Sequence, residues 1–142
     1  MVSEFAIIDT NVVVAGLLTA RADSPVARIL DGMLAATFAF VVSEALLAEY
    51  RAVLLRPKLC RLHGLSEAEV DTILADLARH AIVLPPAGTA PQAPDPGDQF
   101  LWDLLASRAD LVLVTGDKLL LQDKAGPQRV ISPETFAARL QH

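Results

Sequence analysis

The chain has 142 residues, which at roughly 150 residues per domain corresponds to about one domain. Hydrophobic residues make up 53% of it and charged residues 20%, a composition that excludes a disordered chain and favours a packed core. The net charge of −5 excludes nucleic-acid binding driven by overall positive charge, so any contact with RNA must be local. We therefore expect a single domain over residues 1–142.

The sequence predicts neither a membrane span nor a disulfide framework. No apolar run approaches the roughly 20 residues of a membrane helix, because charged residues such as Asp9, Asp31 and Glu44 interrupt the hydrophobic N-terminal half. The first apolar stretch lacks the basic leader of a signal peptide. With Cys60 as the single cysteine, a reducing compartment is the simplest setting. These features predict a soluble cytoplasmic protein without a membrane partner.

Short apolar runs alternate along the chain with longer segments of helical periodicity. The predicted strands are, in chain order, residues 5–8, 38–42, 82–84, 111–114 and 130–131. The predicted helices are residues 11–18, 25–34, a segment after Ser43 that ends or bends at Arg56-Pro57, 67–80, 98–108 and a last one starting at Ser132-Pro133. Residues 85–97 hold five of the nine prolines and predict a loop.

The order of these elements predicts the fold class. Most of the strands are apolar on both faces, as in a parallel sheet that helices cover on both sides. Ser24, Ser43 and Ser66 each precede a helical segment and are predicted N-caps. We expect a three-layer α/β/α domain with a mostly parallel central sheet.

Two aspartates follow predicted strands. Asp9 comes directly after residues 5–8, and Asp117 follows 111–114 with Thr115-Gly116 between them. In open parallel sheets, ligands bind beyond the carboxyl ends of the strands. If the two strands are neighbours, both carboxylates point into one crevice.

Two further acids are placed by helical angle, at about 100° per residue. Glu49 lies at the edge of the apolar stripe of the helix after Ser43, whereas Glu44 points to solvent. On the later helix the apolar stripe faces inward, with Asp98 at its flank and Asp103 pointing outward; the stripe consists of Phe100, Leu101, Leu104 and Leu105. We therefore expect Glu49 to be half-buried and Asp98 to lie near the edge of the sheet.

Four carboxylates are thus predicted to converge at one end of the sheet: Asp9, Glu49, Asp98 and Asp117. Like charges at close range repel one another, and a cation can offset that cost. Oxygen-only ligands favour Mg²⁺ or Mn²⁺. The chemistry that such a site supports is metal-assisted hydrolysis of a phosphodiester bond.

The acids stand in motifs whose order and spacing match a known family. These motifs are Asp9-Thr10-Asn11, the segment from Ser43 to Glu49, Asp95-Pro96-Gly97-Asp98 and Thr115-Gly116-Asp117. Over essentially the whole chain the sequence resembles the PIN-domain ribonucleases, specifically the VapC-like toxins of type II toxin–antitoxin pairs.

The resemblance implies a metal-dependent endoribonuclease that uses Mg²⁺ or Mn²⁺ and acts on RNA. Its catalytic and metal-binding residues would be Asp9, Glu49, Asp98 and Asp117. Asn11 and Thr115 would support them by orienting carboxylates. Asp95 is a candidate fifth acid, and Asp98 is preferred to it because Asp98 lies beside the apolar stripe.

The resemblance also implies an antitoxin protein as a partner. The high apolar fraction and the aliphatic helices near the N-terminus predict a homodimer or a larger homo-oligomer. Local contacts to RNA would come from basic side chains, for which the candidates are Arg51, Arg56, Lys58, Arg61, Lys118 and Lys124.

Other interpretations compete with this one. Asp9 and Asp98 could simply cap helices, Glu49 could form an ion pair, and Asp117 could belong to a turn. A phosphatase of the haloacid dehalogenase type needs a second aspartate where Asn11 stands. No Gly-x-Gly-x-x-Gly follows the first strand, which disfavours a dinucleotide-binding domain. The remaining alternative is a non-catalytic PIN-like or receiver-like module that binds a cation and a protein partner.

Overall fold

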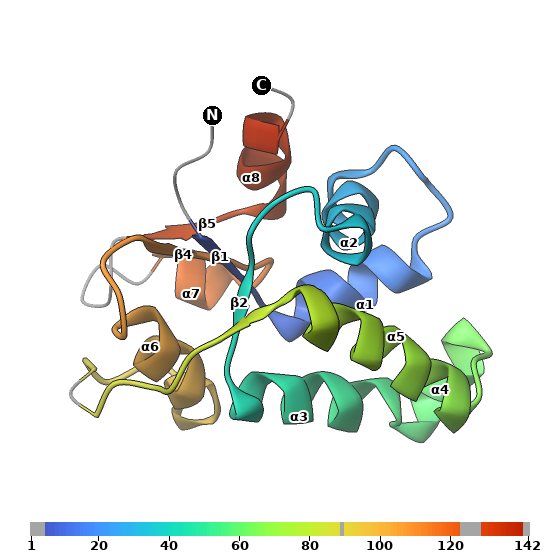
Figure 1. The fold of residues 1–142 in the computed structure, drawn as a ribbon, viewed down its shortest axis with the longest axis horizontal. Coiled ribbons are helices and arrows are strands. Elements are labelled where there is room, and N and C mark those ends of the chain that lie inside the picture. The colour runs from blue at the N-terminus through green and yellow to red at the C-terminus, as the bar shows by residue number, and fades with distance from the viewer. Residues whose placement is uncertain (1–4, 89, 123–128, 141–142) are drawn as a thin grey trace.

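The computed structural model describes residues 5–88, 90–122 and 129–140 (Figure 1). Its strands are β1 (Phe5–Ile8), β2 (Val41–Val42), β3 (Ile82–Val83), β4 (Leu111–Val114) and β5 (Val130–Ile131). Within these residues β1 pairs with β4, β4 with β5 and β2 with β3, always in parallel. A parallel bridge between Ala6 and Phe40 joins the two groups, so the strands lie in the order β3-β2-β1-β4-β5.

Helices fill most of the chain between the strands. They are α1 (Thr10–Leu18), α2 (Pro25–Ala35), α3 (Glu44–Leu54), α4 (Pro57–His63), α5 (Glu67–His80), the 3₁₀ turn η1 (Pro96–Asp98), α6 (Gln99–Leu105), α7 (Lys118–Gln122) and α8 (Pro133–Leu140). The three predicted serine caps are confirmed, because the hydroxyls of Ser24, Ser43 and Ser66 accept hydrogen bonds from the first turns of α2, α3 and α5. The break at Arg56-Pro57 is confirmed as well, since Pro57 starts a new helix.

The helices form layers around the strands. Helix α2 packs against α8, and α3 packs against α5 and α6. In Figure 1, α2 and α8 lie in the upper part of the molecule and α3 to α6 in the lower part, with the strands between them. The predicted α/β/α class with a parallel central sheet is confirmed.

Several elements differ from the sequence prediction. Strand β2 is shorter than 38–42, although Phe40 still bridges to β1. Helix α6 ends at Leu105 rather than near residue 108, because the Ser107 hydroxyl donates to the Leu104 carbonyl over 2.6 Å and so competes with the next helical hydrogen bond. Helix α7 was not predicted, since its few residues are too short to show a helical period.

The core is built where both faces of the sheet meet the helices. The side chains of β1 and β4 are almost entirely buried, and Trp102 of α6 is fully buried beside them. Tyr50 of α3 is also fully buried, and its hydroxyl donates to the carbonyl of Ile8 at the end of β1. This bond ties α3 to the carboxyl end of the central strand. None of the described helices is both long enough and apolar enough to cross a membrane.

Candidate active site

The carboxyl ends of β1 and β4 lie side by side. The two strands pair in parallel with Ile8 opposite Val114, and the Asp9 amide donates to the Val114 carbonyl over 2.9 Å. Asp9 and Thr115, the residues that follow the two strands, are therefore neighbours, and Asp117 comes two residues later. The condition set in the sequence analysis, that the two strands are neighbours, is therefore met.

A network of hydrogen bonds holds the Asp9 carboxylate in place. The Thr115 hydroxyl donates to Asp9 Oδ2 over 2.8 Å, and the Asn11 amide donates to the same oxygen over 3.2 Å. The Thr10 backbone amide donates to Asp9 Oδ1 over 2.7 Å. Asp9 thus has the helix-capping role given above as an alternative, but only one of its two oxygens is used for it.

The same network reaches the chain around Asp117. The Asp117 amide donates to Thr115 Oγ1 over 3.0 Å, and the Gly116 amide donates to Asn11 Oδ1 over 3.1 Å. Asn11 and Thr115 therefore connect the end of β1 to the segment that carries Asp117. Asp117 Oδ1 accepts from the Leu119 amide over 2.9 Å in the turn that starts α7.

Helix α3 brings Glu49 to this end of the sheet. Tyr50 and Leu46 face the core, so the preceding position, Glu49, lies half-buried at the edge of the apolar stripe, as predicted. Glu44 is exposed, also as predicted. Because the Tyr50 hydroxyl is bonded to the end of β1, the rotation of α3 about its axis is fixed, and Glu49 lines the same pocket as Asp9.

Asp98 enters from the turn that precedes α6. Its side chain makes no capping hydrogen bond, so the capping role considered above is not observed. Asp95, three residues earlier, is exposed and accepts from the Gly97 amide over 2.9 Å. Of the two, Asp98 lines the pocket with the other acids, whereas Asp95 lies outside its lining.

The four acids line one open pocket of about 490 Å³. Its acidic wall is formed by Asp9, Glu49, Asp98 and Asp117. Apolar side chains also line it, among them Val14 and Leu18 of α1 and Phe100 of α6, and Arg56 is its basic member among the described residues. Four carboxylates from four separate elements therefore share one solvent-accessible space.

The carboxylates of the pocket perturb one another. Burial raises the pKa of Asp98 to about 6, and the charges of neighbouring carboxylates add to that rise. Those neighbours are Asp9, Asp95, Asp117 and Glu49. Among the described residues, no lysine or arginine forms an ion pair with any of the four acids of the pocket. Within the part of the chain that the structure describes, their mutual repulsion is therefore not offset by salt bridges.

Asp9 is the most deeply buried of these acids. Burial raises its pKa above the usual value, while the hydrogen bonds from Thr115 and Thr10 act in the opposite direction. The charges of Asp117 and Glu49 raise its pKa further. The arrangement is typical of functional sites, where burial and like charges are brought together.

A family profile described as PIN domain matches residues 6–119, which is most of the chain and includes all four acids. The chain belongs to the PIN-domain family. PIN domains are generally nucleases and usually bind divalent metals, so the acid pocket of this PIN domain is its candidate active site. No curated protein and no solved structure matches the chain significantly.

The side chains of this PIN domain fit a hard divalent cation in their chemistry. Within the described residues, no three histidine, cysteine or carboxylate side chains lie close enough to enclose a metal ion directly. Mg²⁺ does not require such a cage, because it keeps several waters and binds through one or two carboxylates. Thr10, which lines the pocket, has a buried hydroxyl with no partner among the described residues, a group that bound water or a ligand usually satisfies.

The basic residues considered for RNA contacts separate into distinct groups. Arg51 forms ion pairs with Glu67 and Asp71 and so is committed to the α3–α5 packing. Arg56 is exposed and lines the acid pocket of the PIN domain. Lys58 and Arg61 on α4 and Lys118 on α7 are exposed away from the lining, and Lys124 lies outside the described residues.

The sequence prediction missed the contribution of Phe100. The helical angle placed it in the core with Leu101, Leu104 and Leu105, but it is only half-buried and forms a wall of the pocket. Its place directly after Asp98-Gln99 is a signal that could have suggested this role. Thr10 was likewise quoted only as part of a motif, and its unpartnered hydroxyl becomes visible only when the fold is known.

Proposed function

We propose that this PIN domain is an endoribonuclease that depends on Mg²⁺ or Mn²⁺ and hydrolyses RNA phosphodiester bonds at the acid pocket. The observation that carries the proposal is the pairing of β1 with β4, which brings the Asp9 and Asp117 segments together beside Glu49 and Asp98. A pocket of four acids without salt bridges to the described residues is costly for folding and useful for binding a cation.

The side chains of the pocket have separate roles in this proposal. Asp9, held by Thr115, Asn11 and Thr10, is the fixed carboxylate around which the site is organised. Further carboxylate oxygens in the pocket come from Asp117, Glu49 and Asp98. A divalent cation bound by these groups would lower the pKa of an attacking water and offset negative charge on the phosphate.

Arg56 is the basic side chain best placed to contact the substrate. It lines the same pocket as the acids and is exposed, so its guanidinium can reach a phosphate without leaving a buried partner unpaired. We propose that Arg56 binds an RNA phosphate beside the bond that is cleaved. This local contact would allow an acidic protein of net charge −5 to bind RNA.

We further propose that the chain is the toxin of a toxin–antitoxin pair, with a cognate antitoxin and a homodimeric or larger assembly. The resemblance of the four acidic motifs to VapC-like toxins supports this role. A neighbouring gene for a small inhibitory protein would support the pairing, and the purified neighbour should suppress cleavage. A monomer in sedimentation at tens of micromolar would contradict the proposed self-association.

The decisive experiment is an RNA digestion with and without a chelator. Wild-type protein should cleave single-stranded RNA with Mg²⁺ or Mn²⁺ and not with EDTA, and Asp117→Asn should reduce the rate by more than about 100-fold. Asp76→Asn, which changes a carboxylate of α5 outside the pocket, is the matched control. Metal-independent cleavage, or parental activity of Asp117→Asn, would overturn the proposal. Metal binding without cleavage would instead favour the non-catalytic module.

A further inference from the structure

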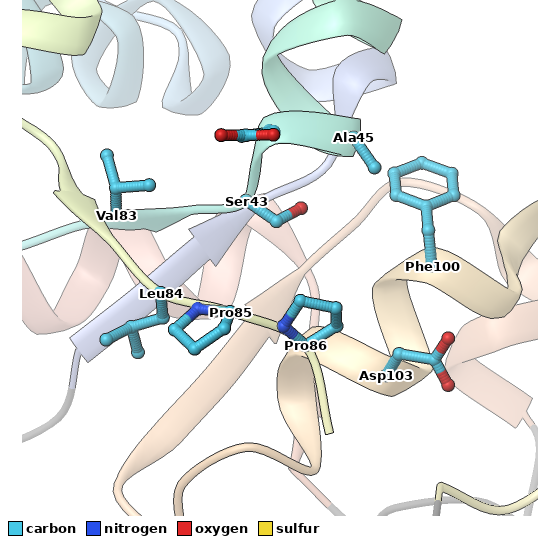
Figure 2. Close-up of a pocket in the computed structure, with 9 residues that line it drawn as sticks. Ser43, Ala45, Val83, Leu84, Pro85, Pro86, Phe100 and Asp103 are labelled. Carbon is cyan, nitrogen blue, oxygen red and sulfur yellow. The ribbon is translucent and has the colours of Figure 1, made fainter. Parts of the chain in front are cut away.

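A second groove of about 610 Å³ adjoins the acid pocket (Figure 2). It is formed by the start of α3, the end of β3 with the prolines that follow it, and one face of α6. Its lining includes Ala45, Val83, Pro86, Phe100 and Asp103. The volume lies in the range of about 300–1,000 Å³ that is common for small-ligand sites.

The chemistry of this groove excludes a phosphate and suits a nucleobase. Its walls are apolar, and Val83 is 54% exposed within them. Its charged members are Glu44 and Asp103, and no lysine or arginine is among the described residues that line it. A phosphate would be repelled by these carboxylates, whereas the flat apolar face of a base and the amino groups on its edge are complementary to them.

Phe100 joins this groove to the acid pocket. Its side chain lines both spaces, and it lies two residues after Asp98 on the same turn of chain. In Figure 2 the ring extends from α6 toward Ala45 at the start of α3, and Asp103 projects from the next turn of α6. A nucleotide whose phosphate lies at the acids would therefore have its own or its neighbour's base beside the Phe100 ring.

We propose that the groove receives one unpaired base next to the cleaved phosphodiester, stacked on Phe100, with Asp103 accepting a hydrogen bond from an exocyclic amino group of that base. This inference rests on the proposed ribonuclease function and adds a substrate preference to it. Cytosine, adenine and guanine carry such an amino group, and uracil carries a carbonyl oxygen in its place. The groove therefore selects an amino-bearing base against uracil.

The Asp103 carboxylate is positioned for this role by its own helix. The Gln99 side-chain Nε2 donates to Asp103 Oδ1 over 3.1 Å, and Gln99 Oε1 accepts from the Ala93 backbone amide over 2.9 Å. Asp103 is half-buried and oriented by this hydrogen bond, where the sequence had predicted an outward side chain. Among the described residues Oδ2 of this carboxylate has no donor, so it can serve as an acceptor in the groove.

The first test measures the stacking contact. The cut site is mapped on a mixed single-stranded oligoribonucleotide, and steady-state cleavage is compared for wild type, Phe100→Leu and Leu62→Ala. Leu62 is an exposed apolar residue of α4 that lines neither space, so its variant should keep the parental KM. Phe100→Leu should raise KM about tenfold or more with little change in kcat, because the base stacks on the ring equally in the enzyme–substrate complex and in the transition state.

The second test measures the base preference. Two oligoribonucleotides that differ only by cytosine or uracil beside the cut should differ in kcat/KM by about tenfold in favour of cytosine, as expected for a hydrogen bond to a charged group. Asp103→Asn should move this ratio toward one. A purely structural role of Asp103 would lower both rates and leave the ratio unchanged.

The outcomes separate this inference from the proposed function. Metal-dependent cleavage by wild type with a cytosine-to-uracil ratio of one, or with an unchanged KM in Phe100→Leu, would overturn the base site alone and leave the groove to a protein partner. An absence of cleavage on every RNA would overturn both. A cytosine preference that is lost in Asp103→Asn, together with the raised KM of Phe100→Leu, would support the base site.

Discussion

Helix α3 carries charged residues to two clusters that are built in opposite ways. On one face, Glu49 joins Asp9, Asp98 and Asp117 in a pocket where like charges meet. On another, Arg51 lies between two acids of α5: its Nη2 is 2.7 Å from Glu67 Oε1, and its Nε is 2.8 Å from Asp71 Oδ1. The acids of the first cluster form no salt bridges with the described residues, whereas both acids of the second cluster form ion pairs with Arg51.

The pKa values follow this difference. The Arg51 guanidinium lowers the pKa of Asp71 through its hydrogen bond, so this acid is charged at little cost in the folded chain. Burial and the surrounding carboxylates raise the pKa of Asp98 to about 6 instead. The paired cluster connects two helices, whereas the acid pocket costs folding free energy. Unlike the paired cluster, the acid pocket does not contribute to stability through ion pairs among the described residues, which is consistent with a role in binding.

The largest expected effect comes from removing the central charge of the acid pocket. Asp9→Asn should lower RNA cleavage by more than about 100-fold, because it removes the negative charge at the centre of the pocket. The new NH₂ group would also take the place of Oδ2, which now accepts from the Thr115 hydroxyl and the Asn11 side-chain amide, so that donors would meet a donor. Initial cleavage rates with Mg²⁺ or Mn²⁺ measure the loss, and circular dichroism checks the fold.

The matched change in the paired cluster is Asp71→Asn. It removes one carboxylate of the same size from the surface and should leave the cleavage rate at the parental level. If Asp71→Asn lowered cleavage as much as Asp9→Asn does, the distinction between the two clusters would be wrong. A parental rate for Asp9→Asn would remove that residue from the active site.

A smaller loss of cleavage activity is expected when the four acids are kept and a hydrogen bond that orients them is removed. Thr115→Val keeps the volume of the side chain but deletes the hydroxyl that donates to Asp9 and accepts from the Asp117 amide. We expect kcat to fall about 10- to 100-fold, the range typical of residues that orient metal ligands. Thr115→Ser should restore most of the rate, whereas a change that acts only through packing would not be rescued by serine.

The fold followed from local signals in the sequence wherever those signals were strong. Apolar runs at β1 and β4 and the capping serines set the elements in nearly the observed places. Helix α7 was missed because five residues cannot display a helical period, and its start depends on the Asp117 cap. The end of α6 depends on Ser107, whose competing hydrogen bond leaves no periodic pattern.

The candidate site was predictable only as far as strand order could be guessed. Asp9 and Asp117 were placed by the rule that sites follow strand ends, but their adjacency needed the pairing of β1 with β4. The choice of Asp98 over Asp95 agrees with the pocket lining. The role of Phe100 in the pocket lining was missed, because helical periodicity does not distinguish a core position from the rim of a pocket, and only its place next to Asp98-Gln99 could have suggested it.

A moderate effect is expected from pH in the absence of metal. The pKa of Asp98 is 3.8 in the unfolded chain and about 6 in the folded one, so between these values the folded chain holds a proton that the unfolded chain has lost. The free energy of unfolding should therefore fall as the pH rises from 4 to 7, by about 1 kcal/mol once solvent screening at this half-exposed group is considered. Chemical denaturation in EDTA at several pH values measures it.

Two variations sharpen this pH test. Asp98→Asn should flatten the decrease between pH 4 and 7, and Mg²⁺ or Mn²⁺ should raise the stability most at pH 7, where the carboxylates are charged. Acids with lowered pKa values, such as Asp71 and Asp110, contribute the opposite slope, and they do so at lower pH. A wild-type stability that rose from pH 5 to pH 7 without metal would contradict the predicted repulsion.

The smallest effect is expected in the paired cluster. Arg51→Gln removes the guanidinium from Glu67 and Asp71, all three of which are exposed, so Tm should fall by no more than a few degrees. Because exposed charges are screened, the difference from wild type should shrink further at high salt. Thermal melts at low and high salt measure it. A large loss of stability that salt does not reduce would mean that the Arg51 side chain stabilises the fold by packing on α5. The contrast between the paired cluster and the acid pocket would then not be purely electrostatic.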